Sequence, residues 1–204
     1  MPMWKHNYIS KILSYILHPI FIPIYVTFLY IRIFKNVITY DISEYLLSVV
    51  GIGTLLLPLS TILLLKKIKL IDSIHLKKSK ERIIPILSTA VYLYITAKLL
   101  MTGNINSPLN SYLIGVVVTL TWILIFTRRM KVSLHTSAIS SALGFFIYLS
   151  HSFLINLQSI IVITTITIGI VATARIKLKA HTCKEIAVGV IFGIIPQLGY
   201  IYLY

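Results

Sequence analysis

The chain is short of acidic residues and of cysteine. Only 5 of its 204 residues are Asp or Glu, against 19 Lys and Arg, and Cys183 is its one cysteine. No internal disulfide can form, so cysteine content says nothing about the redox compartment. Charged residues make up 12% of the chain and hydrophobic residues 57%. A soluble domain of this length would have too little polar surface, so the composition indicates an integral membrane protein.

The sequence also lacks the marks of separate functional modules. No small-residue cleavage site follows the first apolar run, so we expect no secretory signal peptide. Neither a low-complexity tail nor a convincing internal repeat is present. We therefore predict a single integral membrane domain over residues 1–204.

Long apolar runs fill most of the chain. A helix needs about 20 apolar residues to cross the hydrocarbon core. Seven runs approach that length, at residues 9–34, 44–65, 83–101, 110–127, 133–151, 154–174 and 185–204. The prediction is an all-α fold, a polytopic transmembrane helical bundle with about seven spans. We expect Pro19 and Pro23 to kink the first span, which membrane helices tolerate.

The positive charges lie in a few connections between these runs. Residues 66–82, 128–132 and 175–184 follow the second, fourth and sixth runs, so two crossings separate each from the next. Together with the N-terminus they hold 16 of the 19 Lys and Arg. The positive-inside rule then predicts that this face and the N-terminus are cytoplasmic, with the C-terminus outside. We predict a multi-pass protein of the cell (inner) membrane.

A set of polar side chains on this face could act on a phosphate group. Ser133 can cap a helix whose free N–H groups attract anions, and His135 lies in its first turn. His181 and Glu185 are four residues apart, so the carboxylate can hold the imidazole in one tautomer. Arg175 offers a planar fork of donors to phosphate oxygens. These residue types together suit phosphoryl transfer without a metal.

Simpler readings of the same residues stay open. Thr182 and Glu185 form a capping-box pattern, which would start the last helix without any catalytic role. His135, His181 and Glu185 could instead bind zinc, although the surrounding cations disfavour a metal ion. We expect His18 to be a packed or hydrogen-bonded histidine within the first span, and His75 to be a loop residue.

The spacing of these residues resembles a known family. Arg175, His181 and Glu185 resemble the third signature of the type-2 phosphatidic acid phosphatase superfamily, which reads Ser-Arg, five residues, His, three residues, Asp. VSLH at 132–135 resembles the second signature, Pro-Ser-Gly-His. KKSKERIIP at 77–85 stands where the first signature, Lys, six residues, Arg-Pro, is expected.

The resemblance implies a six-helix phosphatase-like core over about residues 44–204, plus one further span. It implies that His181 attacks phosphorus to form a phospho-histidine, that His135 protonates the leaving alcohol and that Glu185 orients His181. The phosphate-binding residues it implies are Arg175 and Ser133, helped by Arg82 and Lys78. No cofactor is implied.

The resulting expectation is a membrane lipid-phosphate phosphatase. Its substrate would be a lipid phosphomonoester or pyrophosphate of the phosphatidate or polyisoprenyl-phosphate class. The alternative is a catalytically inactive relative that serves as a scaffold or lipid-binding subunit, because the first signature departs from the family pattern. Lipid phosphates and membrane lipids are the expected partners. We expect no nucleic acid, since membrane topology accounts for most of the net charge of +14.

Overall fold

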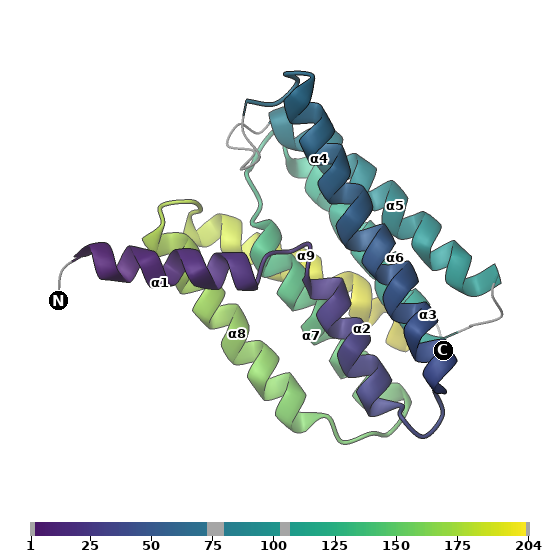
Figure 1. Cartoon of the computed structure of the whole chain (residues 1–204). Helices are drawn as coiled ribbons and strands as arrows, with labels where there is room; N and C mark the ends of the chain where they lie inside the picture. The colour runs from purple at the N-terminus through teal and green to yellow at the C-terminus, as the bar shows by residue number, and fades with distance from the viewer. Residues whose placement is uncertain (1–2, 73–79, 103–106, 203–204) are drawn as a thin grey trace. The chain divides into compact units, whose positions relative to one another are not determined.

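Every regular element of the structure is a helix in the residues that it describes, 3–72, 80–102 and 107–202. The structure is a computed structural model (Figure 1). Within these residues, five helices are long and apolar enough to cross a membrane. They are Tyr40–Lys67, Ile83–Thr102, Pro108–Phe126, Gln158–Lys177 and Cys183–Ile201. This confirms the predicted all-α class and is consistent with a helical membrane bundle.

The chain divides into two compact units. One comprises Met1–Ile22 and Met130–Tyr204, and the other comprises Pro23–Arg129. We describe each by itself. The single domain over residues 1–204 and the core over about 44–204 stay predictions.

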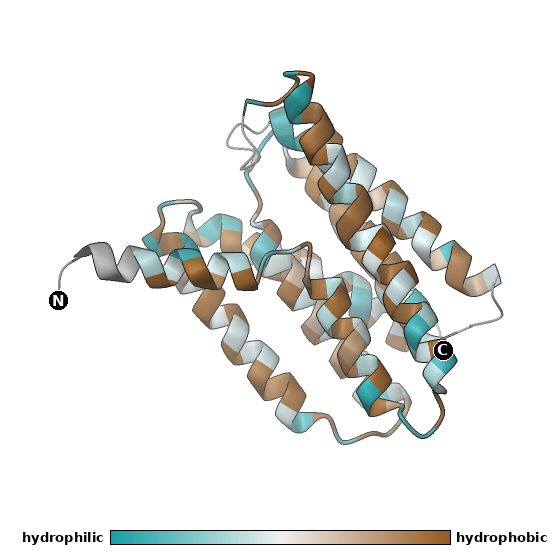
Figure 2. Cartoon of the chain, viewed as in Figure 1, coloured by the Kyte–Doolittle hydropathy of each residue, from teal (hydrophilic) through white to brown (hydrophobic). Residues whose placement is uncertain are grey.

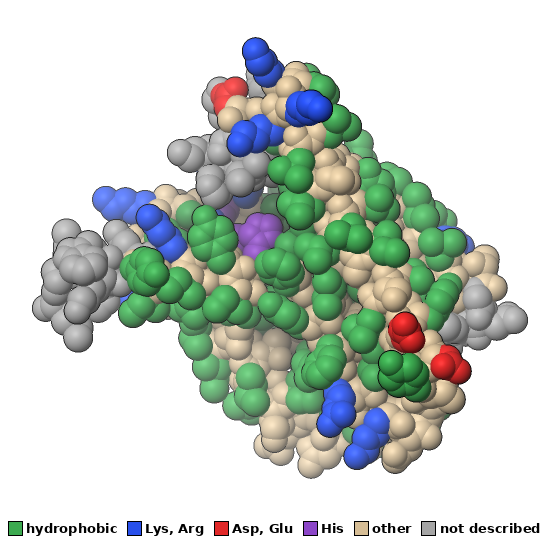
Figure 3. All heavy atoms as spheres, in the orientation of Figure 1, with side chains coloured by type: hydrophobic (Ala, Val, Ile, Leu, Met, Phe, Trp, Pro, Cys, Tyr) green, Lys and Arg blue, Asp and Glu red, His purple; other side chains and the backbone are tan. Residues whose placement is uncertain are grey.

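The unit Pro23–Arg129 is built on one long span and a helical pair. Its elements are α2 (Ile22–Ile33), α3 (Tyr40–Gly51), the π-helix η1 (Ile52–Leu56), α4 (Leu57–Lys67), the 3-10 helix η2 (Lys80–Arg82), α5 (Ile83–Thr102) and α6 (Pro108–Phe126). The π-helix lies just before Pro58, whose ring nitrogen cannot donate the regular helical hydrogen bond. Hydrophilic residues gather at the end of α4 (Figure 2), where exposed lysines follow an apolar surface (Figure 3).

The unit that contains the C-terminus has three long helices and a short N-terminal helix that packs mainly against one of them, α8. Its elements are α1 (Met3–Ile16), α7 (Leu134–Ser152), α8 (Gln158–Lys177), α9 (Cys183–Leu198) and the 3-10 helix η3 (Gly199–Tyr202). Contact between α7 and α9 is the most extensive between described elements. It is close because Gly189 and Gly193 face α7, where a Cβ on either would overlap atoms of Ser133, Thr136 or Ser137. Small residues at this spacing let two helix backbones approach one another.

The prediction of a single kinked span over residues 9–34 is wrong. α1 ends at Ile16 and α2 begins at Ile22. Pro19 has no N–H to donate, and the residue before a proline is driven out of the α conformation. The chain turns instead, and the N–H of Phe21 donates to the carbonyl of His18 at 2.9 Å. α2 has 12 residues, or about 18 Å, less than the ~30 Å of a hydrocarbon core.

The run at 133–151 forms α7 but is not among the five apolar helices. Most of its residues are buried, including serines and a threonine along the face toward α9. These polar side chains of α7 are therefore buried against α9. The break expected between the runs 133–151 and 154–174 is present, because α7 ends at Ser152 and α8 begins at Gln158.

Candidate functional site

The site is built where four helix ends meet in the unit Met1–Ile22 with Met130–Tyr204: the ends of α1 and α8 and the starts of α7 and α9. α7 begins directly after Ser133, whose hydroxyl oxygen accepts a hydrogen bond from the N–H of Thr136 at 3.5 Å. This confirms the predicted cap. The N–H of Ser133 itself donates to the carbonyl of Glu185 at 3.3 Å. The start of α7 is thereby tied to the start of α9.

The segment between α8 and α9 is held by two local motifs. At the end of α8, the N–H of Lys179 donates to the carbonyl of Ile176 and the N–H of Ala180 to that of Arg175. Lys179 has a φ of 51°, so the helix ends in a Schellman turn without the usual glycine. At the start of α9, Thr182 and Glu185 form the expected capping box. Both motifs fix the backbone on either side of His181.

The pair of His181 and Glu185 forms as predicted. Nδ1 of His181 lies 3.0 Å from Oε2 of Glu185 and 3.0 Å from the carbonyl oxygen of Lys131. Both partners are acceptors, so Nδ1 carries the proton and Nε2 carries the lone pair of the neutral ring. The His181 side chain is buried. A buried imidazole with its proton fixed on Nδ1 presents Nε2 as a nucleophile or base.

His135 is tied to the end of α1. Its Nε2 lies 3.1 Å from the backbone carbonyl oxygen of Ser14. The acceptor requires the proton on Nε2, so Nδ1 carries the lone pair when the ring is neutral. The ring of His18 packs edge-on against that of His135, with centroids 5.3 Å apart. His135 therefore closes the last turn of α1 while lying in the first turn of α7.

Arg175 brings a positive charge to His135. Its Nη1 donates to the hydroxyl oxygen of Ser14 at 3.4 Å. Arg175, His18 and His181 all lie close enough to His135 for the charge of each to act on its ring. The Nε of Arg175 is buried and has no hydrogen-bond partner among the described residues. A buried guanidinium donor without a partner is unusual and has capacity for an anion.

The structure thus brings together Ser133, His135, Arg175, His181 and Glu185. It adds Ser14 and His18, which lie outside the three segments that resemble family signatures, residues 77–85, 132–135 and 175–185 (the signature-like segments). The expectation that His18 lies within a continuous span is wrong, because it lies in the turn between α1 and α2. The His-Pro dipeptide was the available sign of that turn.

The remaining predicted residues come from the other unit. Arg82 is buried at the end of the 3-10 helix η2. Its part in the site stays a prediction. Lys78 and His75 lie outside the described residues.

The zinc hypothesis finds no support in the geometry. Among the residues that the structure describes, no group of three His, Cys, Asp or Glu side chains is arranged to hold a metal ion. Glu185 is instead committed to His181 and to the backbone N–H of Thr182.

No protein-family model, curated protein or solved structure matches the chain significantly. The arrangement of the site and the spacing of its residues therefore carry the functional proposal.

Proposed function

We propose that this protein is a lipid-phosphate phosphatase related to the type-2 phosphatidic acid phosphatases. The observation that carries the proposal is the bond between Nδ1 of His181 and Glu185. It leaves Nε2 of His181 as the nucleophilic nitrogen. Arg175, whose charge acts on the neighbouring His135, supplies a guanidinium for the phosphoryl oxygens.

The reaction has two steps. Nε2 of His181 forms a bond to phosphorus while the bond from phosphorus to the lipid oxygen breaks, and that oxygen takes a proton from His135. Because Nε2 of His135 faces the Ser14 carbonyl, the proton comes from Nδ1 of the imidazolium. Water then attacks phosphorus and returns a proton to His135 as the P–N bond breaks and inorganic phosphate leaves.

Arg175 and Ser133 hold the phosphoryl group in this proposal, with Arg82 and Lys78 as further donors. Cationic donors stabilise charge on the equatorial oxygens during transfer. Glu185 holds the His181 ring and stabilises the positive charge that develops on it. In this scheme the nucleophile, the general acid and the phosphate-binding groups are all side chains of the protein.

We further propose that the site faces the cytoplasm in the cell membrane. α7 is a further crossing besides the five apolar helices, because α6 and α8 cross on either side of it in sequence and its polar face is covered by α9. Residues 66–82, 128–132 and 175–184 then share one face and hold 14 of the 19 Lys and Arg. Such a bias places that face inside.

The test is phosphate release by detergent-purified protein from a panel of lipid phosphates, with chelator present. We expect release to fall to background in His181→Ala, because no other group replaces the nucleophile. His151→Ala is the matched control, since His151 is exposed at the opposite end of α7. Its release should equal that of the unaltered protein.

A second function is favoured by one observation. Nε2 of His135 is used to close α1, which suits a rigid anion-binding site without turnover. A folded protein that binds lipid phosphates and releases no phosphate from any of them would replace the phosphatase with this lipid-binding role. Release that persists in His181→Ala would also reject the phospho-histidine mechanism.

A further inference from the structure

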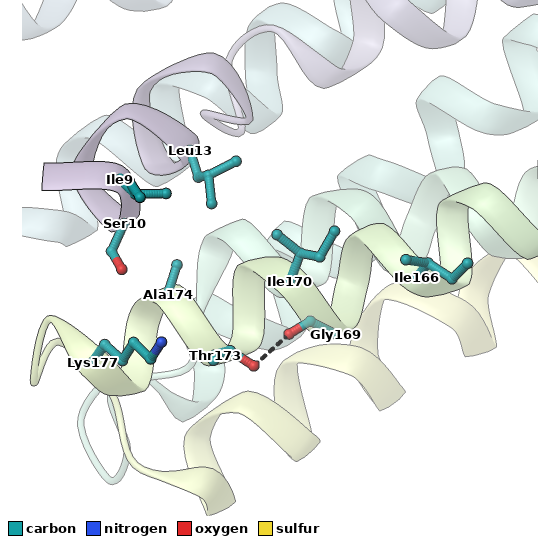
Figure 4. Close-up of a pocket in the computed structure, with 9 residues that line it drawn as sticks. All are labelled: Ile9, Ser10, Leu13, Ile166, Gly169, Ile170, Thr173, Ala174 and Lys177. Carbon is teal, nitrogen blue, oxygen red and sulfur yellow. Dashed lines mark hydrogen bonds between the residues drawn. The ribbon is translucent and has the colours of Figure 1, made fainter. Parts of the chain in front are cut away.

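An open groove of about 570 Å³ runs between α1 and α8. Ile9 and Leu13 of α1 and Ile166 and Ile170 of α8 line it (Figure 4). The hydroxyl of Thr173 in its wall donates to the carbonyl of its own helix at Gly169, 2.9 Å away. The groove therefore offers mainly hydrocarbon to an occupant.

Gly169 lines this groove, and no contact with another described helix requires a glycine at its position. A Cβ at Gly169 would meet no heavy atom of the described residues within 4 Å, whereas one at Gly189 or Gly193 would overlap α7. Glycine inside a helix is less stable than alanine, and no packing contact within the described residues compensates for it at Gly169. The close approach of α9 to α7 explains the other two glycines. Gly169 instead is one of the residues that line the groove.

The groove has a charged end and an apolar end. Lys177 lies at one end and Ile166 at the other (Figure 4). The distance between them along α8 is about 16 Å, or half of the ~30 Å hydrocarbon core. Arg175, two residues before Lys177, reaches Ser14 in the histidine cluster. The length and the charge match one leaflet's acyl chain with an anionic headgroup.

We propose that this groove binds an acyl chain of the substrate lipid and places its phosphate at Lys177 and Arg175. This inference rests on the proposed function for the identity of the headgroup. The committed occupant is a long-chain lipid phosphate, such as phosphatidate. Its chain lies along α8 past Gly169.

The test compares Gly169→Leu with Gly199→Leu. The first variant adds a side chain at a residue that lines the groove, and the second adds the same side chain elsewhere; a Cβ at either glycine meets no heavy atom of the described residues within 4 Å. Phosphate release is measured from long-chain phosphatidate and from a water-soluble phosphomonoester. We expect kcat/KM for phosphatidate to fall about tenfold in Gly169→Leu, the equivalent of roughly two buried methylenes. Release from the soluble ester should stay unchanged, as should both activities of Gly199→Leu.

Direct binding separates failure of the groove from failure of the phosphatase. Binding of fluorescent phosphatidate is measured for both variants, with a matched fluorescent diacylglycerol as the uncharged probe. If the folded protein hydrolyses nothing, weakened phosphatidate binding by Gly169→Leu alone still supports the groove. Three results would overturn the proposal. They are equal phosphatidate binding by the two variants, an equal loss of phosphate release from both substrates in Gly169→Leu, and an affinity for diacylglycerol equal to that for phosphatidate. A change of oligomeric state in Gly169→Leu also overturns it, because a second copy would then be the occupant.

Discussion

At the scale of single residues, Glu185 serves two partners with one oxygen. Its Oε2 accepts from the N–H of Thr182 at 3.1 Å and from Nδ1 of His181 at 3.0 Å. The first bond stabilises the start of α9 and the second orients an imidazole. The capping box and the His181–Glu185 pair are therefore both present, and substitutions can separate them.

Glu185→Gln should remove the charge beside His181 while keeping an amide oxygen for the N–H of Thr182. We expect kcat for lipid phosphate to fall about 100-fold, because the imidazolium is no longer stabilised. Thr182→Ala should instead destabilise the protein by about 1 kcal/mol through the lost cap, with kcat nearly unchanged. Steady-state kinetics and thermal unfolding of both variants provide the measurements. Parallel losses of activity and stability in the two variants would mean that Glu185 is only a helix cap.

The sequence predicted the contacts that are close along the chain. Four residues separate His181 from Glu185, and helical spacing alone brings such a pair together. The bond from His135 to Ser14 spans 121 positions. It depends on where α1 ends, and hence on the break at Pro19. Ser14 carried no signal of its own, since nothing local distinguishes it from Ser10.

At the scale of elements, the contact between α7 and α9 fixes the positions of the two signature-like segments. Gly193 lies against the backbone of α7, where a Cβ would overlap the carbonyl oxygen of Ser137 and approach the backbone nitrogen of Ser141. The hydroxyl of Ser141 donates to the carbonyl of Gly193 at 3.2 Å. Neither backbone atom can move aside without disturbing its own helix.

Gly193→Ala should therefore destabilise the protein by about 1–3 kcal/mol, the usual cost of overpacking a close contact. Gly199→Ala is the control, because a Cβ there meets no heavy atom within 4 Å. Unfolding by heat in detergent compares the two variants. A similar unfolding midpoint for both would contradict the close packing of α7 on α9.

Apolar length predicted most helices, but it failed at residues 9–34 and did not explain the polar residues of α7. Residues 9–34 read as one span because apolar residues continue through Pro19, and membrane helices often accept a proline. The His-Pro dipeptide nevertheless turns the chain. The polar residues of α7 are explained only once α9 is seen to cover them, which no local pattern reports.

At the scale of the whole molecule, the apolar outer faces and the uneven charges are consistent with one membrane arrangement. Val162, Ile163 and Ile166 of α8 are each about half exposed or more, as expected for a surface that faces lipid. Arg175 and Lys177 occupy the last turn of the same helix. Since α8 has 20 residues, or about 30 Å, its two ends should lie on opposite faces of the membrane.

Cys183 makes this arrangement testable, because it is the one cysteine of the chain and is exposed at the start of α9. We expect a membrane-impermeant maleimide to modify Cys183 in inverted vesicles but not in intact cells. Ser152→Cys in a Cys183→Ser background should show the reverse pattern, because Ser152 is exposed at the far end of α7. Labelling of both cysteines from one side would contradict the crossing of α8. Labelling of Cys183 only in intact cells would keep the crossing but place the histidine site outside. The positive charges around that site would then reflect phosphate binding more than topology.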